Sequence, residues 1–359
     1  MRFKEDIDIV RRRIDAFWEN ELLDRALVSI IAPKKKNLSL NMFDEQEYAK
    51  DPSYMKRFWL DPQTIHNRNI KRLENTYLGG DALPSIFLDF GTSGHCNFYG
   101  AKPIFFKDTI WFDPVWKNLY EYNLVFDEAA IDRYVAIATE IANLSQGDYF
   151  IGMPDNCGTL DALGHLYGSA NVLTEMLLNP DAVQKAIDAV NEGWKIGNEL
   201  FYNATKAINH GSCHSWMHLL ANGKMGQMQC DMSVMFSTAM YEKFVYNELQ
   251  TQIDWFDYPI YHFDGVEQEK HLDILLSFEK LKAIQWTHVA GQPKASRFIS
   301  ILQRIQNAGK RLIVFIDPEE VSTMLENLSA KGLNLIIENV PDPETADTIL
   351  QYVKNHSKE

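Results

Sequence analysis

The strongest constraint on the fold is a repeated alternation of short apolar runs and helical segments in the second half of the chain. Four β-like runs follow one another: "YPIYHF", "LKAIQW", "RLIVFI" and "LNLII". A helical segment follows each run, and the spacing between runs is about 20 to 30 residues, the size of one βα unit. Near-continuous apolar strands that alternate with helices predict a parallel sheet covered by helices.

Other segments add helices and strands to this pattern. Apolar residues spaced three or four apart predict an N-terminal helix, and Asn179 followed by Pro180 predicts the start of another. "DYFIGMPD" and "GQMQCD" are predicted to be strands, and "TAMYEKFVYNELQTQIDWF" an amphipathic helix. Residues 35 to 75 are predicted to be irregular, with turns or helix starts at the two "DP" pairs, and residues 82 to 127 to be strands and long loops.

Two architectures fit this pattern, a closed eightfold barrel and an open doubly wound sheet. The chain has 359 residues, and it contains neither G-x-G-x-x-G after a strand nor G-x-x-x-x-G-K-[ST]. The nucleotide-binding forms of the open sheet therefore lose support. We predict an α/β fold, a single (β/α)₈ TIM-type barrel domain over residues 1–359, with a helical and loop-rich elaboration over residues 1–80.

Charge and composition narrow the classes of partner. The chain has 35 Lys and Arg against 49 Asp and Glu, a formal net charge of −14, which disfavours nucleic-acid binding. The N-terminus is too charged for a signal peptide, and no apolar stretch reaches the ~20 residues that span a membrane. The four cysteines include no C-x-x-C pair. We expect a cytoplasmic protein with a small-molecule substrate, and a homodimer is compatible with the sequence.

Polar residues at the ends of the predicted strands are the candidate site, because the active site of a βα barrel lies at the carboxyl ends of its strands. These residues are Asp155, Asp231, His262, Asp264, Gln285, Trp286, His288, Asp317 and Glu338. Asp231, His262, Asp264 and Glu338 form a convergent set. His262 and Asp264 are two residues apart, so both can face one pocket. Imidazole with carboxylates suits either a divalent metal or acid–base catalysis.

Several of these residues also have a purely structural interpretation. Asp317 is expected to be a helix N-cap, and Asp161 is interpreted in the same way. Three histidines and two cysteines are interpreted as surface or core residues: His165, His210, His218, Cys157 and Cys213. Four aromatic residues near the proposed pocket could form a flat-walled site, although such residues are more often core: Trp216, Trp255, Trp286 and Tyr261. We predict substrate contacts for Asp155, Trp216, Tyr261, Gln285 and Trp286.

The chain resembles the uroporphyrinogen decarboxylase superfamily, which includes the corrinoid- and coenzyme M-type methyltransferases. The resemblance covers most of the chain after about residue 80. "MPDNCGTLDALGHLYG" and "QCDMSVMFSTAMYEKFVYNEL" are similar to two segments of the family, and "IYHFDG" resembles its H-x-C-G motif. The resemblance implies a (β/α)₈ barrel.

The resemblance also implies a metal site. In the zinc methyltransferases the metal is held by the histidine and cysteine of H-x-C-G and by a second cysteine near the last strand. These positions fall on His262, Asp264 and Glu338, with Asp231 as the nearby acidic residue, so both thiolates are replaced by carboxylates. Such a set favours zinc or another divalent metal. The decarboxylase branch uses an arginine-containing stretch similar to "RQAGRY", which this chain lacks.

Three functions stay open. The first is a methyltransferase that moves a methyl group between a small substrate and a corrinoid protein or thiol, assisted by metal at His262, Asp264 and Glu338. The second is a metal-free decarboxylase or lyase in which Asp231 and His262 transfer protons. The third is a non-catalytic barrel that binds a ligand or a corrinoid protein. In the catalytic interpretations Asp231, His262 and Asp264 carry the chemistry.

Overall fold

The structure is a computed structural model that describes residues 1–36, 38–120, 124–155 and 157–359. Most strands belong to one sheet with the order β2-β1-β13-β12-β11-β10-β9, in which every neighbouring pair is parallel except β1 and β2. These strands are β1 (Leu27–Pro33), β2 (Thr76–Gly80), β9 (Met225–Met228), β10 (Tyr258–Phe263), β11 (Ala283–Trp286), β12 (Arg311–Ile316) and β13 (Leu333–Ile337).

A second sheet has the order β3-β6-β7-β8, with β3, β6 and β7 parallel and β8 antiparallel to β7. Its strands are β3 (Ser85–Phe87), β6 (Phe150–Gly152), β7 (Ser212–His214) and β8 (Leu219–Ala221), and a separate ribbon pairs β4 (Pro103–Phe105) with β5 (Ile110–Phe112). The Ser212 hydroxyl accepts the backbone N–H of Met225 at 3.1 Å, so β7 lies beside β9. Over the described ranges the hydrogen-bonded strands do not form a closed ring. The structure thus shows a mixed α/β fold with a mostly parallel central sheet.

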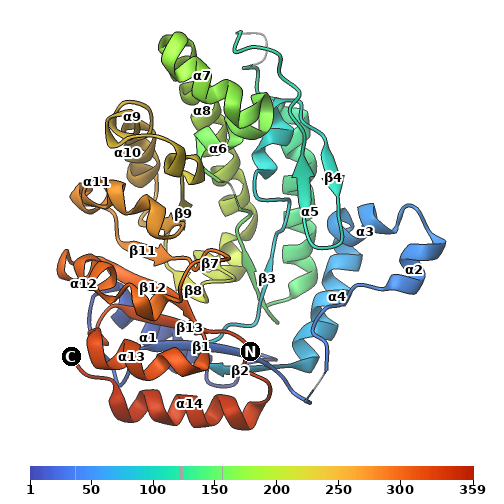
Figure 1. Cartoon of the computed structure of the whole chain (residues 1–359). Coiled ribbons are helices and arrows are strands. Elements are labelled where there is room, and N and C mark those ends of the chain that lie inside the picture. The colour runs from blue at the N-terminus through green and yellow to red at the C-terminus, as the bar shows by residue number, and fades with distance from the viewer. Residues whose placement is uncertain (37, 121–123, 156) are drawn as a thin grey trace.

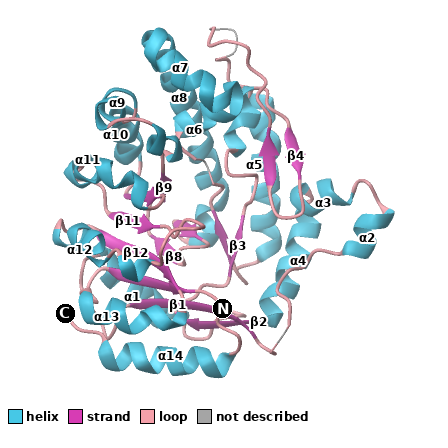
Figure 2. Ribbon diagram, viewed as in Figure 1, coloured by secondary structure: helices cyan, strands magenta, loops and turns pink. Residues whose placement is uncertain are grey.

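Helices surround the strands (Figures 1 and 2). They are α1 (Ile7–Trp18), α2 (Glu45–Lys50), α3 (Tyr54–Leu60), α4 (Pro62–Asn75), α5 (Glu128–Ser145), α6 (Thr159–Leu163), α7 (Ser169–Leu178), α8 (Pro180–Asn209), α9 (Thr238–Phe244), α10 (Tyr246–Trp255), α11 (Leu272–Ser277), α12 (Ile299–Asn307), α13 (Val321–Asn327) and α14 (Pro343–His356). Helices α13 and α14 lie along the outer side of the larger sheet (Figure 1). None of the helices in the described part of the chain is both long and apolar enough to cross a membrane.

Helix α1 covers the ends of the strands opposite to the candidate site. Its buried residues Val10, Ile14 and Phe17 belong to an apolar cluster that also contains Ile260 of β10 and Ile313 of β12. Both isoleucines lie toward the amino ends of their strands. The interior is therefore filled with hydrocarbon at this end, and the polar interior residues lie toward the carboxyl ends.

A buried ion pair fixes this N-terminal segment. The Asp81 side chain is fully buried and accepts hydrogen bonds from Arg25 at 2.6 Å and from the backbone N–H of Val28 at 3.0 Å. Arg13 of α1 contributes a third contact at 3.3 Å. Because a buried charge without its partner is costly, Asp81 holds α1, β1 and the end of β2 in one arrangement.

The structure confirms most of the predicted elements. "YPIYHF" is β10, "RLIVFI" is β12 and "LNLII" is β13, residue for residue. The prediction for residues 35 to 75 is wrong in part, because α2, α3 and α4 lie there. Helix α4 begins directly after Asp61, whose carboxylate accepts the backbone N–H of Thr64 at 2.8 Å. The predicted single helix after β9 is two helices, α9 and α10, which meet at Val245.

Candidate active site

Strand β10 positions His262 in the interior of the fold. Side chains alternate along a strand, and Ile260 belongs to the interior cluster while Tyr261 and Phe263 belong to the core beneath the helices. His262 is therefore on the inner side, as is Gln285, its register partner on β11. Asp264 follows two residues after His262, at the carboxyl end of the strand.

The hydrogen bonds of His262 define its protonation. Its Nδ1 is bonded to Oε1 of Gln285, which can only accept, so Nδ1 carries the proton. Gln285 is held in turn by a bond from its Nε2 to the Thr287 hydroxyl at 2.9 Å. Burial lowers the pKa of His262, and the Gln285 bond and the charges of Asp264 and Asp161 oppose that shift. The ring is thus a neutral imidazole, and its Nε2 has no hydrogen-bond partner among the residues that the structure describes.

Asp161 and Asp231 form a carboxyl pair close to this histidine. Asp161 accepts hydrogen bonds from the backbone N–H groups of Asp231 at 2.9 Å and Met232 at 2.8 Å. Burial and the charge of Asp231 raise the pKa of Asp161 to about 8. Burial, followed by the charge of Asp264, raises the pKa of Asp231 to about 7. Both groups can therefore exchange protons near neutral pH.

A chain of amides connects a third carboxyl to this pair. Gln227 donates from Nε2 to Asp155 at 2.9 Å and to Oε1 of Gln229 at 3.1 Å, and Gln229 donates to Asp231 at 2.9 Å. Burial and the charge of Asp231 raise the pKa of Asp155 to about 8. His214 lies at the other end of this series of hydrogen bonds, with its Nε2 2.9 Å from Oε1 of Gln227.

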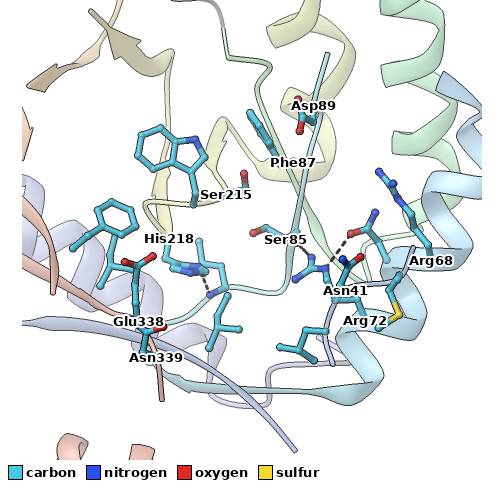
Figure 3. A pocket seen from close by; sticks show the side chains of 18 of the residues that line it. Asn41, Arg68, Arg72, Ser85, Phe87, Asp89, Ser215, His218, Glu338 and Asn339 are labelled. Atoms are coloured by element: carbon cyan, nitrogen blue, oxygen red, sulfur yellow. Dashed lines mark hydrogen bonds between the residues drawn. The ribbon is translucent and has the colours of Figure 1, made fainter. Parts of the chain in front are cut away.

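The largest space near these residues is a cavity of about 600 Å³ between α4 and the end of β13, here called the α4 cavity (Figure 3). Trp216 lines the α4 cavity, and its indole stands edge-on to His262 with ring centroids 6.0 Å apart. Trp216 and Phe87 also line a hollow of about 20 Å³ that Asp155 and His214 share. The indole therefore borders the α4 cavity on one side and the imidazole and carboxyl groups on the other.

A second cavity reaches the carboxyl pair from another side. It has a volume of about 460 Å³, and Asp161, Asp231 and Cys157 line it together with the exposed Trp111 and Met235. We call it the α6 cavity. One oxygen of Asp231, Oδ1, is buried and has no hydrogen-bond partner among the described residues. That oxygen is available to a ligand.

The site residues predicted from the sequence lie in several different environments in the structure. Asp231, His262, Asp264 and Gln285 lie in one polar region, with Asp155 connected to it. Glu338 lines the α4 cavity, where burial raises its pKa, and the charged groups that act on it are Asp317 and His288. Tyr261 and Trp286 belong to the core beneath the helices: Tyr261 receives a hydrogen bond from Tyr241 at 3.1 Å, and Trp286 stacks on Phe263.

The predicted metal ligands do not form a metal site as they stand. Among the residues that the structure describes, no three His, Cys, Asp or Glu side chains are close enough together to hold an ion. Nδ1 of His262 is occupied by Gln285, and Glu338 lies at the α4 cavity. We therefore assign no chemical step to a metal, and metal binding stays a prediction.

Sequence reasoning missed several polar residues of the site. Asp161 is the third residue of α6 and not its cap, so the interpretation as an N-cap is wrong; its carboxylate binds the N–H groups that open the 3-10 helix Asp231–Met235. Gln227 and Gln229 have the same two-residue spacing as His262 and Asp264. That spacing was the available signal, because two polar side chains on the inner side of a buried strand need partners.

Comparison with known proteins finds a similar fold among solved structures. No protein-family model and no curated protein matches the chain. Among solved structures, a methyltransferase from Methanosarcina mazei has a similar fold, with a TM-score of 0.56 over 96% of this chain and 98% of that one. Sequence identity is 11%, so the match shows similarity of fold alone.

Proposed function

We propose that this chain is a methyltransferase-like enzyme with a (β/α)₈ barrel of the uroporphyrinogen decarboxylase type. The observation that carries the proposal is the neutral imidazole of His262, whose Nε2 has no partner among the described residues, in a polar region with three carboxyl groups whose pKa values are raised to about 7 or 8. The similarity of fold to the methyltransferase from Methanosarcina mazei supports it. A methyl acceptor must lose a proton when it is alkylated, and this centre can take that proton.

The residues of the chain have distinct roles in the proposed reaction. As the acceptor atom forms its bond to the methyl carbon, its proton passes to Nε2 of His262, and the methyl donor keeps the electron pair of the bond that breaks. Asp264, together with Asp161 in its ionised form, stabilises the imidazolium that results, because a negative charge near the ring favours it. Gln285 holds the ring in the reactive tautomer. A corrinoid on a partner protein would supply the methyl group.

An assay of methyl transfer from methylcobalamin to small thiols, alcohols and amines tests this proposal. The absorbance of the cobalamin reports the loss of its methyl group. We expect the wild-type chain to accelerate transfer to one acceptor class, and His262→Ala to slow that transfer by about 10²- to 10⁴-fold. His356→Ala, at an exposed histidine in α14, is the matched control and should leave the rate unchanged. Transfer at the wild-type rate in His262→Ala would refute the assignment.

A divalent metal such as zinc at His262, Asp264 and Glu338 is a separate prediction, because a metal on Nε2 of His262 would take the place of the proton transfer to that nitrogen. Metal analysis of protein purified without chelator, repeated for His262→Ala, tests it. Equimolar metal that the substitution removes would support the prediction. Wild-type protein without stoichiometric metal would contradict it.

A metal-free decarboxylase or lyase is the second candidate function, and one observation favours it. The pKa of Asp231 is raised to about 7, so a part of the protein carries a protonated carboxyl that can donate to a carbanion. In that reaction the carbon–carboxylate bond breaks, its electron pair stays on carbon, and Asp231 protonates that carbon. Release of carbon dioxide that depends on Asp231, without any methyl transfer, would favour this candidate over the first.

A further inference from the structure

We infer that the α4 cavity binds a small organic molecule through one anionic group, which Arg68 and Arg72 of α4 receive. The inference names the substrate class of the site proposed above, and in that respect it rests on the proposed function. The two arginines are four residues apart, so they extend from the same face of α4. Both line the α4 cavity and lie on one side of it (Figure 3).

The positive charge at this end of the cavity is not neutralised by an ion pair. Arg72 donates to the backbone carbonyl of Ser85 at 2.7 Å and to the side-chain oxygen of Asn69 at 3.2 Å, and both acceptors are uncharged. Among the described residues, no carboxylate forms an ion pair with Arg68 or Arg72, although Arg13 and Arg25 both pair with Asp81 elsewhere in the chain.

Both arginines are half-buried, so each guanidinium group has lost part of its hydration. This partial burial lowers the pKa of both groups, and that of Arg68 falls to about 10. A half-buried cation without an ion pair is favourable to an anionic ligand that restores the lost interactions. Asp89 is the carboxyl group whose charge acts on Arg68, yet burial raises the pKa of Asp89 as well, and its carboxylate already accepts the N–H of Gly91 at 3.0 Å. An anionic ligand group would supply the missing counterion.

Arg68 is positioned for planar recognition. Its guanidinium carbon lies 3.8 Å from the centre of the Phe58 ring and 5.6 Å from that of Trp59. These contacts hold one face of the guanidinium group and leave the N–H groups at its edge unbonded within the described chain. A carboxylate, sulfonate or phosphonate can accept two such N–H groups side by side.

Two further polar groups point to the same kind of ligand. The Ser215 hydroxyl lines the cavity and is buried without a partner among the described residues. His218 accepts the backbone N–H of Leu83 on Nδ1 at 3.2 Å, so its proton is on Nε2, where it can be donated to a ligand oxygen. Burial lowers the pKa of His218 to about 3, which keeps the ring neutral.

The opposite end of the cavity limits the ligand to one anionic group. Glu338 and Asn339 lie across from the arginines (Figure 3), and Trp216 and Phe315 form an aromatic wall with ring centroids 5.8 Å apart. A second anionic group would meet the Glu338 carboxylate, whereas an apolar or cationic part would fit this wall. With its anionic group at α4, the rest of the ligand extends toward Trp216, which stands next to His262.

Direct binding of benzoate and benzamide to the full chain, measured by calorimetry, tests the inference without turnover. The two probes have nearly the same shape and differ in charge. We expect benzoate to bind at millimolar concentration, benzamide to bind at least about tenfold more weakly, and terephthalate, with two carboxylates, more weakly than benzoate. Arg68→Gln and Arg72→Gln should each weaken benzoate about tenfold or more, and Arg68→Lys less than Arg68→Gln.

Lys71→Gln removes the same charge from an exposed position of α4 and is the matched control, with unchanged binding expected. Because Arg72 also holds Ser85, the thermal unfolding midpoint of each variant is measured with and without benzoate. Benzoate should raise the midpoint of the wild type and Lys71→Gln, and raise that of Arg68→Gln much less. Equal binding of benzoate and benzamide, no binding of benzoate, or equal losses in Lys71→Gln and Arg68→Gln would each overturn the inference. A chain that binds benzoate in this way but transfers no methyl group would refute the proposed function alone.

Discussion

The Asp161 carboxylate accepts the backbone N–H of Asp231 at 2.9 Å, so a residue of α6 holds the chain where it leaves β9. The same carboxylate accepts the N–H of Met232 at 2.8 Å. Both N–H groups open a 3-10 helix and have no partner within it. This contact sets the position of Asp231 relative to His262, and it places two carboxyl groups close together in a buried region.

Asp161→Asn tests this contact. An asparagine presents one oxygen and one NH₂ group, so at least one of the two backbone N–H groups loses its acceptor. We expect the free energy of unfolding to fall by about 1–3 kcal/mol, the cost of an unsatisfied buried donor. Urea denaturation measures it, with Asp188→Asn at an exposed position of α8 as the control. A loss no larger than that of the control would contradict the structural role of Asp161.

Asp155 predicts a dependence of stability on pH. Its pKa in the folded protein is about 8, above the ordinary value of 3.8, so the folded state binds this proton more tightly than the unfolded chain. Its contribution is fully present below pH ~4 and is lost as the pH rises toward ~8. Asp155→Asn keeps an oxygen for Gln227 and removes the titration. The free energy of unfolding of the variant should therefore fall less steeply over this range, by up to ~1.4 kcal/mol per pH unit. The free energy of unfolding is measured by denaturation at several pH values for the variant, the wild type and the control Asp188→Asn. The same dependence of this free energy on pH in all three proteins would rule this out.

Trp216 predicts an effect on substrate binding. The indole lines the α4 cavity and faces His262, so Trp216→Ala removes apolar surface that a bound substrate would cover. We expect KM for the methyl acceptor to rise by about 10- to 150-fold, because roughly 1.5–3 kcal/mol of burial is lost, and Trp216→Phe to have a smaller effect. Trp111→Phe, at an exposed tryptophan of the α6 cavity, is the comparison. An unchanged KM in Trp216→Ala would place the acceptor elsewhere.

The Asp81 cluster predicts a large loss of stability that is unrelated to catalysis. Asp81→Asn leaves the buried Arg25 without its counterion, so we expect the free energy of unfolding to fall by about 3–5 kcal/mol. Asp273→Asn breaks the exposed pair with Arg304 and should cost about 1 kcal/mol or less. Similar losses for the two variants in urea denaturation would show that Asp81 is not a buried anchor.

The repeated βα pattern predicted the strands well because each apolar run is buried on both sides, and such runs have few alternatives. Residues 35 to 75 were harder, since α4 turns two arginines toward a cavity and its apolar pattern is weak. The spacing of His262 and Asp264 predicts that both side chains lie on one side of the strand, because alternation along a strand is geometric. Trp286 and Tyr261 show the limit of that argument. Trp286 is next to Gln285 in β11 and Tyr261 is next to His262 in β10, so both side chains point to the opposite side of their strand, toward the helices.

Residues brought together by the fold could not be found from spacing alone. Asp161 and Asp231 are 70 positions apart in the chain, and nothing in either segment indicates a hydrogen bond between them. Arg68 and Arg72 line a cavity whose other residues come from segments as far apart in the sequence as Ile31 and Asn339. That neither arginine forms an ion pair within the described part of the chain is visible only once the neighbours of each side chain are known.

The most direct test of the central claim is the single-turnover rate of methyl transfer in the double variant His262→Ala with Asp264→Ala. Benzoate binding is measured on the same preparation to show that the α4 cavity is intact. The account predicts that the rate falls by at least about 10²-fold while benzoate binding is retained. A double variant that transfers the methyl group at the wild-type rate would contradict it. Residues other than the imidazole and carboxyl groups of this site would then carry out the reaction.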